Sequence, residues 1–198
     1  MFQIGKLCVS SLTSTLGTSA IAANAVANSV STLANIPGAT MSLAMIPVIG
    51  QCLGAGEKKQ AQHYTMTLMG VAITGLALAN LALFILMPEV VTWFSLSTEA
   101  STMCTHVVHW FNLFSVFFWA TSFTLPNALR AANDVKFTMV VSVLSMAVWR
   151  LGFSYLLCVR MGWGAVGVWI AMVIDWVCRV ICFVARMKSG AWKTKYQA

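Results

Sequence analysis

Charged residues are scarce in this sequence: Asp, Glu, Lys and Arg make up 9% of its 198 residues, whereas hydrophobic residues make up 59%. A water-soluble domain carries about 25% charged residues, so this composition excludes a chain that faces water over its whole surface. The length would suit one ordinary domain, but here apolar helical segments take it up. We therefore predict an all-α, polytopic membrane protein.

Motifs for metal binding and catalysis are also missing. The six cysteines form no C-x-x-C pair and no cluster with histidine, so their spacing does not indicate a metal site. No Ser/His/Asp or Cys/His arrangement is apparent, and we expect neither an enzyme nor a bound cofactor. The net charge is +7, but no basic patch is interleaved with aromatic residues, which argues against a nucleic-acid partner.

Six apolar segments are separated by short polar links. We predict spans at about residues 1–16, 19–53, 64–87, 102–129, 137–159 and 163–186. The first is partial, because about 1.5 Å per residue leaves it short of a hydrocarbon core of roughly 30 Å. The second is too long for one straight span, and Pro37 and Pro47 should bend it. The pattern predicts a bundle of about six transmembrane helices.

Most lysine and arginine residues lie on one side of these spans. They are found in the links at 51–63 and 130–136 and in the tail at 187–198, while the opposite side carries Glu89 and Glu99. The positive-inside rule makes the basic side cytoplasmic. We therefore expect a multi-pass protein of the cell (plasma) membrane with a cytoplasmic C-terminus.

Three charges fall inside the last two predicted spans. Arg150 lies about two-thirds along one span, Asp175 lies midway along the next, and Arg179 follows Asp175 at i,i+4, a spacing that allows pairing on one face. Charges at bilayer depth are costly and often mark a substrate or ion path. The structural alternative is a buried ion pair that locks the two helices. These residues are our candidates for an ion-coupling, buried charge network.

A polar stripe precedes a proline in the second predicted span. Asn24, Asn28, Ser31 and Asn35 recur at spacings of four, three and four residues, which places them on one helix face, and Pro37 follows. Unpaired amides cannot face lipid, so the stripe meets either another helix or a water-filled substrate cavity. A broken helix often marks a transporter binding site. A simple packing kink is the alternative.

The fourth predicted span is rich in aromatic residues. Such a surface can hold planar or cationic organic molecules, although lipid contact and core packing are commoner explanations. His106 and His109 lie one turn apart on this span, as interfacial residues or in a proton role. We add His109 and Asn112 to the substrate-cavity candidates. The aromatic residues are Trp110, Phe111, Phe114, Phe117, Phe118, Trp119 and Phe123.

Several motifs, in this order, resemble the C-terminal half of a MATE (multidrug and toxic compound extrusion) transporter. The resemblance covers nearly the whole chain. Each motif is weak alone, and their common order and spacing carry the resemblance. The motifs are GTSAIAANAVA at 17–27, Pro37-Gly38, GQCLGAGE at 50–57, LPNALRAAND at 125–134, GVW at 167–169 and RMKSGAW at 186–192.

The resemblance implies two six-helix lobes around a central cavity, and export of small, often cationic, organic compounds driven by inward flow of H⁺ or Na⁺. Only the C-terminal lobe is matched, so the expected partners are the lipid bilayer, the substrates and a missing N-terminal lobe of the same protein. The chain would then be a fragment, or a reading frame started at an internal Met. Such proteins often carry an acid in the seventh or tenth helix.

Residues 1–16 and 102–129 contain no such acid, which leaves Asp175 as the only acid at membrane depth. Two alternatives to drug export remain open at this point. One is a flippase for a lipid-linked saccharide, which belongs to the same superfamily. The other is a truncated fragment or scaffold that does not transport.

Overall fold

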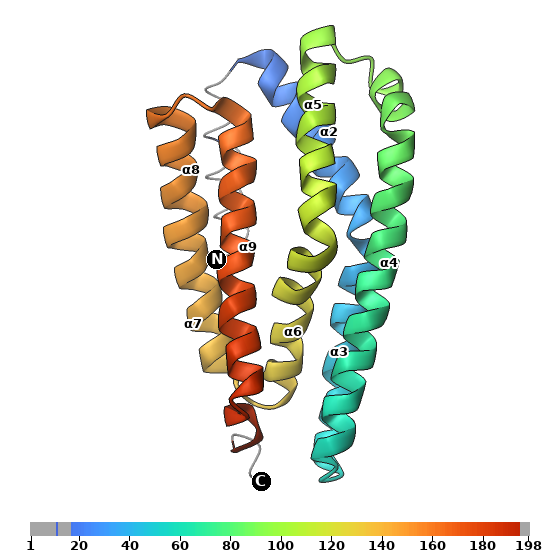
Figure 1. Ribbon diagram of the computed structural model, residues 1–198, viewed down its shortest axis with the longest axis vertical. Helices are drawn as coiled ribbons and strands as arrows, with labels where there is room; N and C mark the ends of the chain where they lie inside the picture. The colour runs from blue at the N-terminus through green and yellow to red at the C-terminus, as the bar shows by residue number, and fades with distance from the viewer. Residues whose placement is uncertain (1–10, 12–16, 195–198) are drawn as a thin grey trace.

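Backbone groups in an apolar environment must bond within their own segment, which favours helices. The computed structural model describes residue 11 and residues 17–194, and all the regular structure within them is helical, arranged as a bundle along one long axis (Figure 1). The helices are α2 (Thr18–Ala34), α3 (Ile36–Gly54), α4 (Lys58–Trp93), α5 (Thr98–Phe114), α6 (Ala120–Ala131), α7 (Val135–Ser145), α8 (Phe153–Tyr155) and α9 (Gly164–Lys188).

Wider, π-helical turns join some of these helices into longer rods. Segment η1 (Ser115–Trp119) links α5 to α6, η2 (Met146–Gly152) links α7 to α8, and η3 (Leu156–Arg160) continues α8. A short 3₁₀ turn, η4 (Ala191–Thr194), follows α9. Isolated π-helical turns occur often at functional sites, and two of these three adjoin the groove and the charge cluster described below.

Four helical stretches of the described chain are long and apolar enough to cross a membrane. They are Ile36–Gly54, Lys58–Trp93, Val135–Cys158 and Val166–Lys188. The prediction of an all-α membrane bundle is thereby confirmed for the described residues. The predicted partial span at 1–16 lies outside them, apart from residue 11.

The predicted bent span at 19–53 corresponds to α2 and α3, which meet at Asn35. The backbone N–H of Asn35 still bonds to the carbonyl of Ser31 at 3.1 Å, so α2 ends in a regular turn. Pro37 falls in the first turn of α3, where its missing N–H leaves no helical hydrogen bond unmade. The proline thus starts a helix here and does not interrupt one.

A glycine after the end of α3 builds the tight turn to α4. Gly56 has a φ of 80°, and its N–H bonds to the Leu53 carbonyl at 2.9 Å, while the Glu57 N–H bonds to the Cys52 carbonyl at 2.9 Å. This pair of bonds is the Schellman motif, in which glycine adopts the left-handed conformation without steric cost. Helix α3 thus ends in a left-handed cap at Gly56.

Two apolar clusters hold the bundle together. One joins α2, α4, α5 and α9 around Phe111 and Trp176, and the other joins α3, α4, α6 and α9 around Ile49 and Phe183. In Figure 1, α5 and α9 run side by side in the same direction, with α2 behind α5. Because α9 belongs to both clusters, its side chains lie where the interior of the bundle is assembled.

An ion pair fixes the turn between α6 and α7 against the end of α9. Arg186 Nε donates to Asp134 Oδ2 at 2.7 Å, and Arg186 Nη2 donates to Asp134 Oδ1 at 3.3 Å. The guanidinium also lies over the Phe137 ring, 4.7 Å from its centroid. A forked contact of this kind fixes direction as well as distance, so this end of the lobe is held in one arrangement.

Candidate functional site

The candidate charge network is assembled between α7 and α9. Asp175 is fully buried, Arg179 is 2% exposed, and Arg179 Nε lies 3.0 Å from Asp175 Oδ1. Ser145, the last residue of α7, donates its hydroxyl to the same carboxylate oxygen. The second oxygen, Asp175 Oδ2, is buried and makes no hydrogen bond within the described chain. One oxygen of this carboxylate therefore accepts two hydrogen bonds, and the other accepts none from the described residues.

The structure also brings Arg150 to this cluster. Arg150 lies in η2 and is 7% exposed. Its Nη2 is 3.0 Å from the sulfur of Met172, about one turn before Asp175 on α9. It interacts electrostatically with Asp175 and Arg179. All three predicted charges thus meet inside the bundle, away from lipid.

Backbone and aromatic groups complete the surroundings of Arg179. Its Nη2 donates to the Ser142 carbonyl of α7 at 3.2 Å, and its guanidinium lies 5.7 Å from the centroid of the Phe123 ring on α6. Burying a guanidinium costs much free energy unless its charge is paired and its N–H groups donate hydrogen bonds. The cluster therefore ties α6, α7 and α9 together at one depth.

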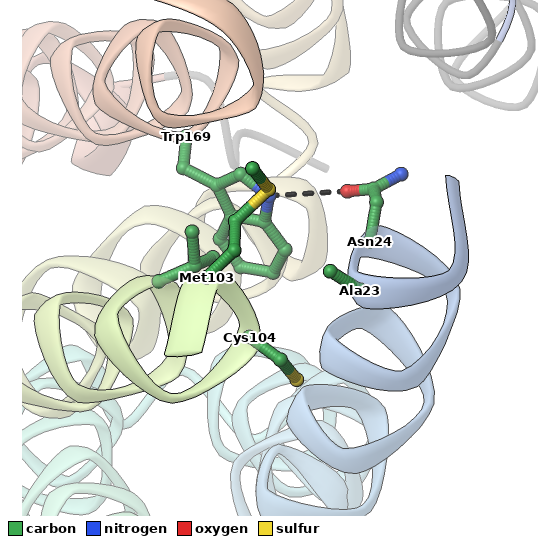
Figure 2. Close-up of a pocket in the computed structure, with 6 residues that line it drawn as sticks. Ala23, Asn24, Met103, Cys104 and Trp169 are labelled. Atoms are coloured by element: carbon green, nitrogen blue, oxygen red, sulfur yellow. Dashed lines mark hydrogen bonds between the residues drawn. The ribbon is translucent and has the colours of Figure 1, made fainter. Parts of the chain in front are cut away.

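The polar stripe of α2 divides into different environments. Asn24 Oδ1 accepts from Trp169 Nε1 of α9 at 3.1 Å (Figure 2) and from Asn28 Nδ2 at 3.1 Å. Asn28 is exposed, and the hydroxyl of the buried Ser31 makes no hydrogen bond to the described residues. The Oδ1 atom of Asn35 is likewise buried and unbonded there. Asn24 thus makes an interhelical hydrogen bond, one of the two roles considered for the stripe.

Asn24 also borders a crevice between α2, α5 and α9. Figure 2 shows Ala23 and Asn24 of α2 opposite Met103 and Cys104 of α5, with the Trp169 ring across one end. The crevice leaves no room even for a water molecule. In this arrangement of the helices it holds no substrate, and the role of the stripe in a cavity stays a prediction.

The remaining three candidates contact α4. Pro37 packs against α4, with its Cβ 3.0 Å from the place where a Cβ on Gly75 would lie. The His109 ring is 4.3 Å from the Phe84 ring, and Asn112 Nδ2 donates to the backbone oxygen of Asn80 at 3.4 Å. All three lie at helix–helix contacts, and substrate binding by them stays a prediction.

A groove of about 880 Å³ lies between α5 and α9. Aromatic rings from both helices line it. Trp110 and Phe114 are stacked on α5, with centroids 6.0 Å apart and planes 10° apart, and Phe111 meets Trp169 of α9 edge to face at 5.3 Å. Glu99 and His106 are its ionisable lining residues, and the rest of the wall is apolar apart from Thr102. The groove can hold an apolar or aromatic organic molecule.

Three contributors to these sites were missed at the sequence level. Ser145 carries no pattern that would pair it with Asp175. Glu99 was assigned to a link, but the Ser97 side chain accepts from the Ala100 N–H and starts α5 at Thr98, so Glu99 lies in the first helical turn. An N-cap serine followed by an acid was the available signal. Trp169 was noticed only as part of a motif.

Taken together, apolar spans, a buried charge cluster and a groove lined by aromatic side chains define a multi-pass helical membrane protein with the features of a transporter. The MatE family model matches residues 1–156. The chain belongs to the MatE family. No solved structure matches it significantly.

Curated relatives are similar over most of this chain. "Probable multidrug resistance protein NorM" of Bacillus cereus is 24% identical over 169 residues, covering 84% of this chain and 36% of the relative. A protein of the same name from Pseudomonas aeruginosa is 26% identical over 204 residues, covering 98% and 39%. "Uncharacterized transporter YisQ" of Bacillus subtilis is 36% identical over 74 residues, covering 36% and 16%. The chain thus spans about two-fifths of the length of these NorM proteins.

Proposed function

We propose that this chain forms the C-terminal lobe of a cation-coupled antiporter that exports drugs or organic cations across the plasma membrane in exchange for H⁺ or Na⁺. Membership of the MatE family supports transport, and the names of the NorM relatives support multidrug export. The share of those relatives that the chain spans, 36% and 39%, fits one of two lobes. The other lobe would be its partner.

The aromatic groove between α5 and α9 is the observation that carries this proposal. Stacked rings bind flat organic molecules, and their faces attract cations. A lipid-linked saccharide carries phosphate and needs cationic side chains around it, whereas no Lys or Arg lines this groove. The groove therefore favours an organic-cation exporter over a saccharide flippase.

Coupling is assigned to the cluster of Asp175, Arg150 and Arg179. A proton or Na⁺ that reaches Asp175 competes with the guanidinium of Arg179 for the carboxylate, because both neutralise the same charge. Both residues of the pair lie on α9, and each also bonds to α7, Asp175 through the Ser145 hydroxyl and Arg179 through the Ser142 carbonyl. Ion binding at Asp175 would therefore weaken the contacts between α9 and α7. Since α9 also forms one wall of the groove, ion binding and substrate binding would act on the same helix.

Orientation follows from the basic residues at one end of the bundle. Helix α4 begins with Lys58 and Lys59, and α9 ends with Arg186 and Lys188 at the same end of the bundle (Figure 1). The positive-inside rule supports a cytoplasmic location for this end and for the C-terminus. Glu99 and the end of the α5–α9 groove that it lines would then lie toward the outside.

Replacing Trp110 with alanine should lower the efflux of a planar cationic dye about tenfold, because the dye loses the stacked pair with Phe114. The efflux rate from cells that express the complete transporter measures this effect. Trp93→Ala is the matched control, since Trp93 is 76% exposed and does not line the groove. Equal efflux by both variants would show that the groove is not the dye site.

Replacing Asp175 with asparagine should make efflux independent of the coupling ion. Asparagine keeps an oxygen for the Ser145 hydroxyl but cannot ionise, so neither a proton nor Na⁺ can be exchanged there. Efflux rates measured over a range of external pH and Na⁺ concentrations test this expectation, with the amount of folded protein measured in parallel. A pH and Na⁺ dependence that matches the wild type would restrict Asp175 to a structural role.

A further inference from the structure

Two lysines lie at the corner where α7 begins and α9 ends, at the basic end of the bundle (Figure 1). The Arg186 guanidinium of α9 lies over the Phe137 ring of α7, 4.7 Å from its centroid. Lys136 directly precedes Phe137, Lys188 is two residues beyond Arg186, and both lysines are exposed. The packing of Arg186 on Phe137 therefore brings two exposed lysines to one corner of the lobe.

The acid of this corner, Asp134, is already neutralised by Arg186. Asp134 is 4% exposed, and both of its carboxylate oxygens accept hydrogen bonds from the Arg186 guanidinium. The other four acids of the sequence lie elsewhere: Asp175 inside the bundle, Glu89 and Glu99 toward its opposite end, and Glu57 just before α4, on the side away from α7 (Figure 1). The charges of Lys136 and Lys188 therefore give this corner a net positive surface, which attracts anions.

Exposed apolar side chains continue from each lysine along the same face of its helix. On α7, Lys136 is followed at intervals of four residues by Val140 and Leu144, which places all three on one face. On α9, Ile181 precedes Lys188 by seven residues, or about two turns, and shares its face. These three apolar residues are exposed, and each lysine stands at one end of a stretch that is long and apolar enough to cross a membrane. The corner thus combines positive charge at the membrane surface with apolar faces at bilayer depth.

We propose that this corner binds an anionic phospholipid, with its phosphate at Lys136 and Lys188 and its acyl chains along the exposed faces of α7 and α9. The phosphate supplies the negative charge that the two ammonium groups attract, and the chains match the apolar faces, which a soluble phosphate compound would leave uncovered. The positive-inside rule accounts for lysines anywhere at this end, but it does not require two of them beside an acid that is already neutralised. The site goes beyond the proposed export function and does not depend on it.

Binding is measured with the full-length protein in micelles of a neutral detergent, from the fluorescence anisotropy of phosphatidylglycerol that carries a fluorophore on one acyl chain. The wild type should bind this lipid about tenfold more tightly than phosphatidylcholine with the same chains and fluorophore. Replacing both Lys136 and Lys188 with glutamine should weaken phosphatidylglycerol binding about 25-fold, at about fivefold for each lysine. Lys58→Gln with Lys59→Gln is the matched control, because it removes two lysines from the same end of the bundle at the start of α4. It should weaken binding by less than about twofold.

Three results would overturn this assignment. Equally tight binding of the two lipids would show apolar contact alone, and equal losses in the two glutamine variants would show a general effect of surface charge. Displacement of the labelled lipid by glycerol 3-phosphate would show a site for soluble anions. Replacing Lys136 and Lys188 with arginine keeps both charges and should preserve binding, which separates loss of charge from loss of structure. Thermal unfolding of each variant in the same detergent is measured in parallel.

Discussion

Replacing Asp175 with leucine should lower the free energy of unfolding of the lobe by about 3–5 kcal/mol, because it leaves an uncompensated guanidinium inside the bundle. Asp175 is fully buried and Arg179, its partner at 3.0 Å, is 2% exposed. Leucine also removes the acceptor of the Ser145 hydroxyl. The shift of the thermal unfolding midpoint in lipid nanodiscs, followed by size-exclusion chromatography, measures this loss.

The double variant Asp175→Leu with Arg179→Leu tests the cause. Removing both charges eliminates the unpaired guanidinium of Arg179 and its repulsion with Arg150, and apolar replacements of buried pairs are often neutral or stabilising. The double variant should therefore be more stable than Asp175→Leu alone, despite carrying one more substitution. If the stability loss of the double variant equals the sum of the losses of Asp175→Leu and Arg179→Leu, the two charges are not energetically coupled. The structural role of the ion pair would then be wrong.

The charge cluster could be predicted from the sequence to the extent that helix geometry defines it. Asp175 and Arg179 pair because residues at i,i+4 share a face, and Arg150 meets them because consecutive spans are antiparallel. The part played by Ser145 was not predictable, since a serine in an apolar span has no periodic signal and its partner lies 30 residues away in sequence.

The groove depends on contacts between helices that periodicity cannot provide. The sequence indicated an aromatic surface on the fourth span, but the wall opposite comes from α9, which is distant in sequence. The start of α5 at Thr98 also mattered, because the four residues before the expected boundary contain Glu99. Boundaries depend on capping hydrogen bonds, here that of Ser97, and they are the least predictable feature of a helix.

The polar stripe on α2 also makes contacts that sequence spacing could not predict. Its spacing placed Asn24, Asn28 and Ser31 on one helix, and Asn35 at the junction with α3. A stripe nevertheless faces several neighbours once the helix crosses the bundle. Asn24 reaches α9, whereas Asn28 is exposed. Sequence spacing therefore gives the face of a residue, and only the packing of the helices decides what that face meets.

Replacing Gly38 with alanine should destabilise the lobe by about 1–3 kcal/mol, because the site has no room for a methyl group. A Cβ there would lie 2.7 Å from Leu76 Cδ1 of α4 and 2.7 Å from Cζ3 of Trp119 in η1. Leu76 is itself fully buried and cannot swing aside freely. Thermal unfolding of the variant in nanodiscs, compared with wild type, gives the size of the loss.

Gly70→Ala on α4 is the matched control, and it should have the opposite sign. A Cβ at residue 70 meets nothing within 4 Å, so alanine there only improves helix propensity, by up to about 1 kcal/mol. Combining Gly38→Ala with Leu76→Ala should cost less than the sum of the single variants, since the added methyl enters the space that leucine vacates. Strict additivity would mean that the two residues do not press on each other, and that α3 approaches α4 for another reason.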